Sequence, residues 1–149
     1  VLADNEPELH AAIAEKPSAQ ALKQAEKHII NRYCRLTIDC GLDELKLSLS
    51  KGFPVIFGMM VPRSFYSTPA SGVFTMPKPD EIRLGGHALL AVGYNDEKQH
   101  FIVRNSWGEE FGDKGYCYIP YEFFTGKYQT SPTDDTQDNA FSFWCLTHE

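Results

Sequence analysis

The sequence predicts an α+β fold in which helices come first and a largely antiparallel β half follows. Three observations favour it. The first third of the chain has capped, alanine- and leucine-rich stretches that are typical of helices. After Gly52 the chain changes to short β-branched and aromatic runs, and turn residues rather than long helices join those runs. We expect residues 1–52 to form a helical segment with one strand, and residues 53–149 to form the β half of the same structural unit.

Each expected helix has a local start or stop signal. Asp4 or Asn5 can cap the first helix and Ser18 the second, because side-chain oxygens of these residue types accept the free backbone N–H groups of a first turn. The third helix has a leucine stripe on one face, and Gly52 follows it where a left-handed residue is favoured. The helices are expected at residues 8–14, 19–27 and 42–50.

Strands are expected where β-branched and aromatic residues gather between turn residues. One lies between the second and third helices, and five follow Gly52. They are expected at residues 28–38, 53–61, 88–94, 100–104, 116–120 and 140–147. Residues 127–139 are polar and are expected to form a surface loop.

Length and charge exclude several classes of protein. A chain of 149 residues has room for one domain of ordinary size, and 42% hydrophobic with 23% charged residues is not the composition of a disordered or collagen-like chain. The net charge is −6 and no basic stripe is present, so no nucleic-acid partner is expected. The apolar run 53–61 is about half of what a bilayer crossing needs, so no membrane partner is expected.

The four cysteines, Cys34, Cys40, Cys117 and Cys145, give no metal-site spacing. Two disulfides are possible by count, but the sequence does not determine which cysteines would pair. No metal and no cofactor are expected. The acids of the polar loop, Asp134, Asp135 and Asp138, are interpreted as a solvated surface, with weak calcium binding as the alternative.

Two segments carry residues suited to proton transfer. His87 follows Gly85 and Gly86 at the start of an apolar strand, and Asn105 ends the next strand, two residues before Trp107. If these strands form a hairpin, His87 and Asn105 come near one end of the same sheet. An amide oxygen can then accept an imidazole N–H and fix the ring for acid–base work, and an indole can shield that hydrogen bond from water.

The segments Gly-Gly-His-Ala-Leu-Leu-Ala-Val-Gly-Tyr, Asn-Ser-Trp-Gly and Gly-Asp-Lys-Gly-Tyr resemble the papain family of cysteine peptidases. The resemblance extends from about residue 45 to the C-terminus, and Pro120-Tyr121 suggests a bacterial-type branch. It implies a papain-like fold, mainly its antiparallel β-barrel half. It also implies that His87 is the general base and acid, that Asn105 orients it, and that Trp107 covers both.

One part of the family pattern is missing. The family places its nucleophilic cysteine roughly 130–150 residues before the histidine, and only 86 residues precede His87. The four cysteines present have other contexts and are interpreted as structural. We therefore expect the nucleophile, and the oxyanion-hole glutamine that accompanies it, on a missing or separate N-terminal segment. That segment would be a light chain or earlier part of the protein, and without it the apolar face it covers would favour self-association.

The resemblance implies a cysteine-type peptidase in which this chain supplies histidine and asparagine and is inactive on its own. A peptide or protein substrate would lie along Gly85 and Gly86, with Ala88, Gly58 and Met59 among the walls of the cleft. The alternative is a catalytically inactive papain-like binding module. The cellular compartment stays open, with a secreted, periplasmic or lysosome-like location slightly favoured by the resemblance.

Overall fold

The computed structural model describes residues 14–39, 41–129 and 135–147, which fall into two compact units divided between Ile30 and Asn31. In the smaller unit, helix α2 (Ala19–Ala25) begins after Ser18, whose side-chain oxygen accepts a hydrogen bond from the backbone N–H of Ala21 at 3.2 Å. This confirms the predicted cap. The helix expected at residues 8–14 lies, apart from Ala14, outside the described residues. The division expected at residue 52 stays a prediction.

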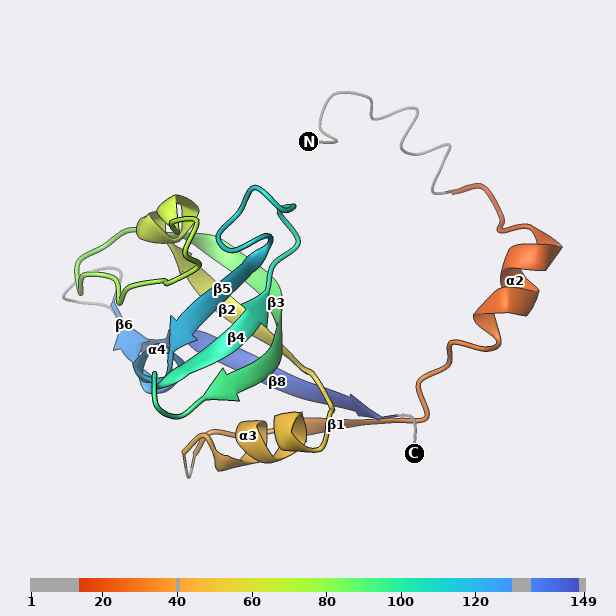
Figure 1. Cartoon of the computed structure of the whole chain (residues 1–149), viewed down its shortest axis with the longest axis horizontal. Coiled ribbons are helices and arrows are strands. Elements are labelled where there is room, and N and C mark those ends of the chain that lie inside the picture. The colour runs from red at the N-terminus through yellow and green to blue at the C-terminus, as the bar shows by residue number, and fades with distance from the viewer. Residues whose placement is uncertain (1–13, 40, 130–134, 148–149) are drawn as a thin grey trace. The chain divides into compact units, whose positions relative to one another are not determined.

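The larger unit is built on one six-stranded antiparallel sheet with strand order β1-β8-β2-β3-β4-β5 (Figure 1). Its strands are β1 (Arg32–Leu36), β2 (Val55–Pro62), β3 (Arg83–Asn95), β4 (His100–Arg104), β5 (Tyr116–Pro120) and β8 (Ala140–Thr147). The predicted antiparallel arrangement is confirmed. Within the segment expected to be a loop, β6 (Lys127–Tyr128) and β7 (Gln137–Asp138) form a short second sheet.

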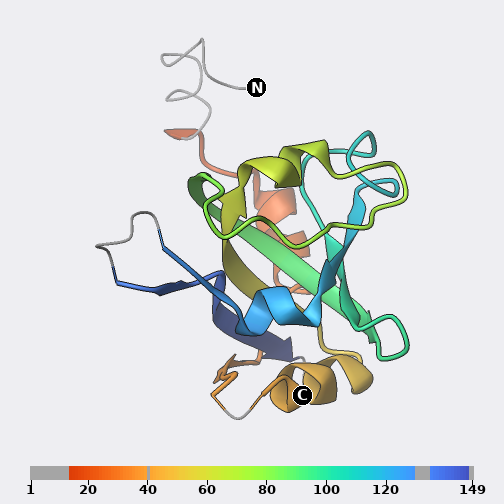
Figure 2. The same cartoon turned by 90° about the vertical axis from the view of Figure 1, so that its left-hand side faces the viewer.

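Three helices accompany the sheet: α3 (Asp43–Ser50), the 3₁₀ helix η1 (Arg63–Ser67) and α4 (Tyr121–Thr125). Helix α3 confirms the leucine stripe, because Leu45 is fully buried while Leu42 and Leu49 pack against the core. Gly52 follows it with φ +83°, as expected. Figures 1 and 2 show η1 at one end of the sheet and α3 at the other. No helix in the described part of the chain is long and apolar enough to cross a bilayer.

Strand β3 begins five residues earlier than predicted, at Arg83. The strand was expected to begin at residue 88, after the two glycines and His87, yet Gly86 pairs with Met60 of β2 inside the ladder. Gly85 has φ +141°, a conformation that a residue with a Cβ rarely adopts. The glycines therefore lie within the strand and keep its surface free of side chains just before His87.

Phe124 of α4 packs against the strands as part of the aromatic core. Its ring centroid lies 5.0 Å from that of Phe57, 4.6 Å from that of Phe101 and 6.2 Å from that of Phe143. These partners belong to β2, β4 and β8, so α4 fills the concave side of the curved sheet (Figure 2). Burial of such side chains contributes roughly 1.5–3 kcal/mol each.

Candidate active site

The β3–β4 hairpin brings His87 and Asn105 together. Asn95 pairs with His100 across the turn, and Leu90 pairs with Arg104, so Asn105 comes level with residue 89, two residues from His87 on the same face of the sheet. The backbone N–H of Asn105 donates to the carbonyl of Gly115 at 2.9 Å, which fixes the end of β4. Nε2 of His87 lies 2.9 Å from Oδ1 of Asn105, as the predicted hairpin requires.

A backbone N–H group identifies which side-chain atom of Asn105 faces His87. The N–H of Ser106 donates to the same side-chain atom of Asn105 at 2.8 Å, and only an oxygen can accept from it. Because that atom is an oxygen, Nε2 of His87 must be the donor toward it. In the neutral imidazole the proton therefore sits on Nε2, and the lone pair of Nδ1 is free to accept a proton.

Trp107 covers the pair. Its ring stacks on that of His87 with centroids 4.9 Å apart and planes 25° apart. The indole ring also stacks on the ring of Tyr66, with centroids 4.7 Å apart, and it meets the rings of Phe65 and Phe111 edge to face. Asn105 is only 4% exposed, so its hydrogen bond to His87 is protected from competing water.

Phe65 and Tyr66 belong to η1 and were missed by sequence reasoning. Tyr66 is 60% exposed, whereas Phe65 is fully buried. The sequence signal was an aromatic pair directly after the apolar run 53–61, but five residues are too few to show a helical period. Through these rings η1 holds the indole over the histidine.

Asn105 also carries an unpaired buried group. Its Nδ2 is buried, and none of the described residues accepts a hydrogen bond from it. A buried donor without a partner costs about 1–3 kcal/mol. Stability does not explain an asparagine here, whereas the need for an amide oxygen facing His87 does.

The predicted cleft residues separate into an open group and a buried one. A Cβ added to Gly85 or Gly86 would meet no atom within 4 Å, so there is open space beside both. Ala88 is exposed and pairs with Gly58 of β2. Met59, by contrast, is fully buried and is the register partner of His87, so the structure corrects its expected place in the cleft wall: it lies beside the histidine in the core.

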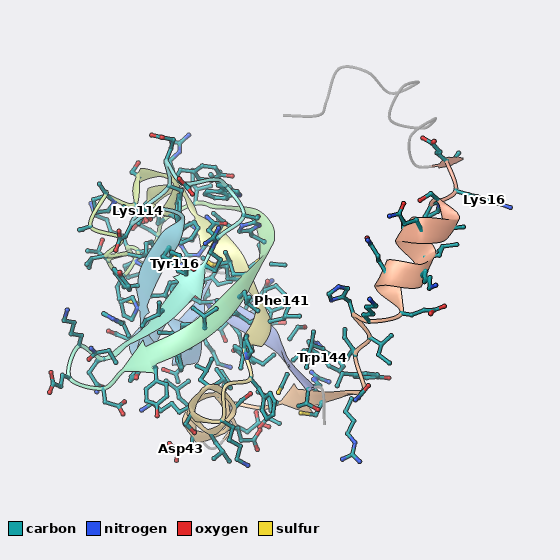
Figure 3. The ribbon with its side chains drawn as sticks, turned by 45° about the vertical axis from the view of Figure 1, so that its right-hand side comes forward. Lys16, Asp43, Lys114, Tyr116, Phe141 and Trp144 are labelled. Carbon is teal, nitrogen blue, oxygen red and sulfur yellow. The ribbon has the colours of Figure 1, made fainter. Side chains whose placement is uncertain are left out.

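Phe141 is a further wall residue that sequence reasoning did not identify. A Cβ at Gly58 would collide with the Phe141 ring, so the ring lies directly on this glycine. Its side chain is 37% exposed at the start of β8, where Figure 3 labels it. The two residues are 83 positions apart, and only the β2–β8 pairing brings them together.

The cysteines that the structure describes lie on one row across the sheet. Cys145 pairs with Val55, and Val55 pairs with Ala91. Continuing along the same row, Ala91 pairs with Val103, and Val103 pairs with Cys117. Cys34 pairs with Cys145. His87 is four residues further along β3 than Ala91, which corresponds to about 13 Å. None of these thiols is placed to share a proton with His87, and Cys40 lies outside the described residues.

The same cysteines differ in burial. Cys117 and Cys145 are buried and Cys34 is exposed, and all three are free thiols. Burial raises the pKa of the Cys117 thiol to about 12. Within the described ranges, no three His, Cys, Asp or Glu side chains gather closely enough to hold a metal ion. Since the chain does contain cysteines, the location of the nucleophile outside it stays a prediction.

Comparisons with known proteins agree with the family resemblance of the sequence motifs. Residues 4–130 match the family model described as papain family cysteine protease. An uncharacterised peptidase C1-like protein of Acanthamoeba polyphaga mimivirus is 39% identical over 116 residues, covering 72% of this chain and 37% of that protein. Cathepsin K of Gallus gallus is 38% identical over 79 residues, covering 50% of this chain and 23% of that protein.

Among solved structures, xylellain, a cysteine protease from Xylella fastidiosa, matches with a TM-score of 0.71 and 35% identity, over 89% of this chain and 45% of that one. The chain thus spans less than half the length of these relatives. The sheet and helices described above have the papain-like arrangement expected from the motifs. The family match over most of its length shows that this chain belongs to the papain family of cysteine proteases.

Proposed function

We propose that this chain is the part of a cysteine-type peptidase that supplies the general base and the residue that orients it. One observation carries the proposal: the 2.9 Å hydrogen bond from Nε2 of His87 to Oδ1 of Asn105, which leaves Nδ1 free. A histidine held in one tautomer by an amide, under an aromatic cover, is suited to take a proton from a thiol.

In the proposed reaction, Nδ1 of His87 takes the proton of a cysteine thiol, and the thiolate attacks the carbonyl carbon of a peptide bond. The imidazolium then gives that proton to the leaving amine, so that an acyl-enzyme and a free amine result. In the second half, His87 takes a proton from water as the water attacks the acyl carbon, and returns it to the departing thiol. Throughout, Asn105 holds the imidazole plane and Trp107 excludes water from their hydrogen bond.

The thiol in this proposal belongs to a segment or light chain outside residues 1–149. Two observations support that assignment: the described cysteines lie on a row about 13 Å from His87, and the chain spans 45% of the length of xylellain. On this basis residues 1–149 alone are inactive, and the activity belongs to the longer or two-chain protein.

The substrate proposed for this site is an extended peptide or protein segment. Open space beside Gly85 and Gly86 lets a second backbone approach closely next to His87. The exposed Ala88, with Gly58 and the ring of Phe141 beside it, would form an apolar wall for one substrate side chain. Met59 supports this wall from the core rather than contacting substrate.

The segment that carries the thiol would cover the outer face of the sheet. Apolar side chains are exposed there on β3: Leu84 is 50% exposed and Val92 39%. An apolar face of this kind is typical of an interaction surface. When the covering segment is removed, the same face would favour association between copies of this chain, which is the alternative partner.

The test uses the full-length protein and an irreversible epoxysuccinyl peptide that alkylates peptidase thiols. We expect one cysteine to be labelled, peptide substrate to be cleaved, and both to be lost in His87→Ala. The matched control is His100→Gln, since His100 stacks on Tyr118 at 5.0 Å, away from the site. Mass spectrometry identifies the labelled residue.

Two outcomes would contradict parts of this proposal. A folded full-length protein that is neither labelled nor active would favour the inactive binding module. Labelling of Cys34, Cys117 or Cys145 would place the nucleophile inside this chain and would overturn its assignment to another segment.

A further inference from the structure

Two thiols face each other across the β1–β8 ladder. Cys34 of the edge strand is the direct register partner of Cys145, with Tyr33 opposite Leu146 and Arg35 opposite Trp144 on either side. Directly opposed residues point to the same face of an antiparallel sheet. Nothing in the proposed peptidase chemistry uses either thiol.

The backbone geometry suits a covalent bond between them. Directly opposed residues of antiparallel strands have Cα atoms about 4.5–5.5 Å apart, and disulfides span Cα separations of about 4.4–6.8 Å. Both cysteines are free thiols in this structure. No movement of one strand along the other is needed to join them.

The surroundings give the two thiols different accessibility. Cys145 is 3% exposed and shares a hydrogen bond with the hydroxyl of Ser48 of α3 at 3.1 Å. Cys34 is exposed and lines a surface hollow together with Arg32, Tyr33, Phe53 and Thr147. Figure 3 shows Trp144, the residue before Cys145, where β8 runs beside β1. A reagent can therefore reach Cys34 directly, whereas Cys145 is shielded from it.

We propose that Cys34 and Cys145 form an oxidisable thiol pair, in which Cys34 is the entry thiol and Cys145 the resolving thiol. The oxidant is a low-molecular-weight disulfide that carries carboxylates, such as oxidised glutathione, because Arg32, a cationic residue, lines the entry hollow.

The exchange proceeds in two balanced steps. The Cys34 sulfur loses its proton and attacks one sulfur of the small disulfide, which breaks the S–S bond and releases one thiol. The Cys145 sulfur then attacks the Cys34 sulfur, which forms the cross-strand disulfide and releases the second thiol. Two protein thiols are oxidised, and one small disulfide is reduced to two thiols.

The pair would control how firmly β1 is held. β1 is the last strand of the sheet, and among the described strands its ladder partner is β8, so a cross-link to β8 would strengthen its attachment. A disulfide there closes a loop of roughly 110 residues, a length for which cross-linking strongly restricts the unfolded chain. We expect the oxidised form to have a Tm about 5–15 °C higher than the reduced form.

The experiment incubates full-length protein with glutathione at a tenfold excess of the oxidised over the reduced form, blocks remaining thiols, and digests with trypsin. Cleavage after lysine and arginine places Cys34 in residues 33–35, Cys40 in 36–46, Cys117 in 115–127, and Cys145 in the peptide that begins at residue 128. We expect peptide 33–35 joined to the peptide that begins at residue 128 in most molecules, together with the rise in Tm.

Cys34→Ser and Cys40→Ser are the matched variants, and Cys34 is exposed, so its replacement leaves the core intact. The cross-link and the Tm rise should vanish in Cys34→Ser and persist in Cys40→Ser. The proposal is overturned if folded protein keeps both thiols free, if Cys34 is recovered joined to Cys40 or Cys117, or if glutathione stays bound to Cys34 unresolved.

Discussion

The two ends of the β3–β4 hairpin differ in how completely their polar groups are hydrogen-bonded. At the site end, His87 is partly exposed, Asn105 buries an unpaired Nδ2, and Trp107 covers both. At the other end, which we call the clamp end, Lys46 of α3 lies 2.6 Å from Oδ1 of Asp96, and the hydroxyl of Tyr121 donates to the same oxygen at 2.9 Å.

At the clamp end, the polar groups each take part in more than one contact. Besides its ion pair, the ammonium of Lys46 lies 4.5 Å from the centroid of the Tyr121 ring. These contacts tie α3 to the β3–β4 turn and to α4. The difference teaches that one hairpin can hold the fold at one end with satisfied polar groups, while keeping an unsatisfied one at the end that performs chemistry.

The largest effect is expected from His87→Ala. If His87 is the general base, kcat/KM of the full-length protein on a peptide substrate should fall by about 10³-fold or more. Tm should change little, because the imidazole is partly exposed and is not part of the buried core. Steady-state kinetics and thermal unfolding measure the two effects. A variant that keeps a tenth of the wild-type activity would show that the site end does not carry the chemistry.

Asn105→Ala should give a smaller loss, since the alanine variant still has an imidazole but no acceptor to fix its tautomer. We expect kcat to fall by roughly 10–100-fold with KM nearly unchanged. Unfolding free energy should stay within about 1 kcal/mol, because the unpaired Nδ2 is removed along with the oxygen. Denaturant titration gives the second value, and a large destabilisation would make Asn105 a structural residue like those of the clamp end.

The smallest effect is expected from Asp96→Asn. Unlike the two variants of the site end, it should lower stability and leave kcat/KM unchanged. Hydrogen bonds from Lys46 and then Tyr121 lower the pKa of the Asp96 carboxyl below its ordinary value. The stabilisation is therefore complete above about pH 4, where the unfolded carboxyl is also ionised, and is lost as the pH falls through the lowered folded pKa.

Urea midpoints should accordingly differ between wild type and Asp96→Asn at pH 7, and should converge at acidic pH, below the lowered pKa of the folded Asp96 carboxyl. Glu97→Gln is the matched control, because it removes the neighbouring carboxylate of the same turn. Equal effects of the two variants would indicate a general charge effect and no specific clamp.

Residues close in sequence made the site predictable. His87 and Asn105 lie on adjacent strands joined by one short turn, so the motif spacing and the hairpin together give their contact. Likewise, the leucine stripe of α3 follows from a period that eight residues suffice to display.

What sequence reasoning missed depends on distant pairing or on very short elements. η1 and α4 have five residues each, too few for a periodic signal, and aromatic packing stabilises them. The contacts of Phe141 with Gly58 and of Cys34 with Cys145 require the register of β8 against β2 and β1. That register is set by which faces the sheet buries, and no local pattern encodes it.

The backbone N–H of Ser106 fixes the orientation of the Asn105 carboxamide before any ligand binds. Turning the Asn105 carboxamide by a half-turn would aim its NH₂ at this N–H, so a donor–donor clash would oppose the flip whichever tautomer the imidazole adopts. Folding itself thus selects the ring nitrogen that bears the proton, and an arriving molecule has nothing left to rearrange there.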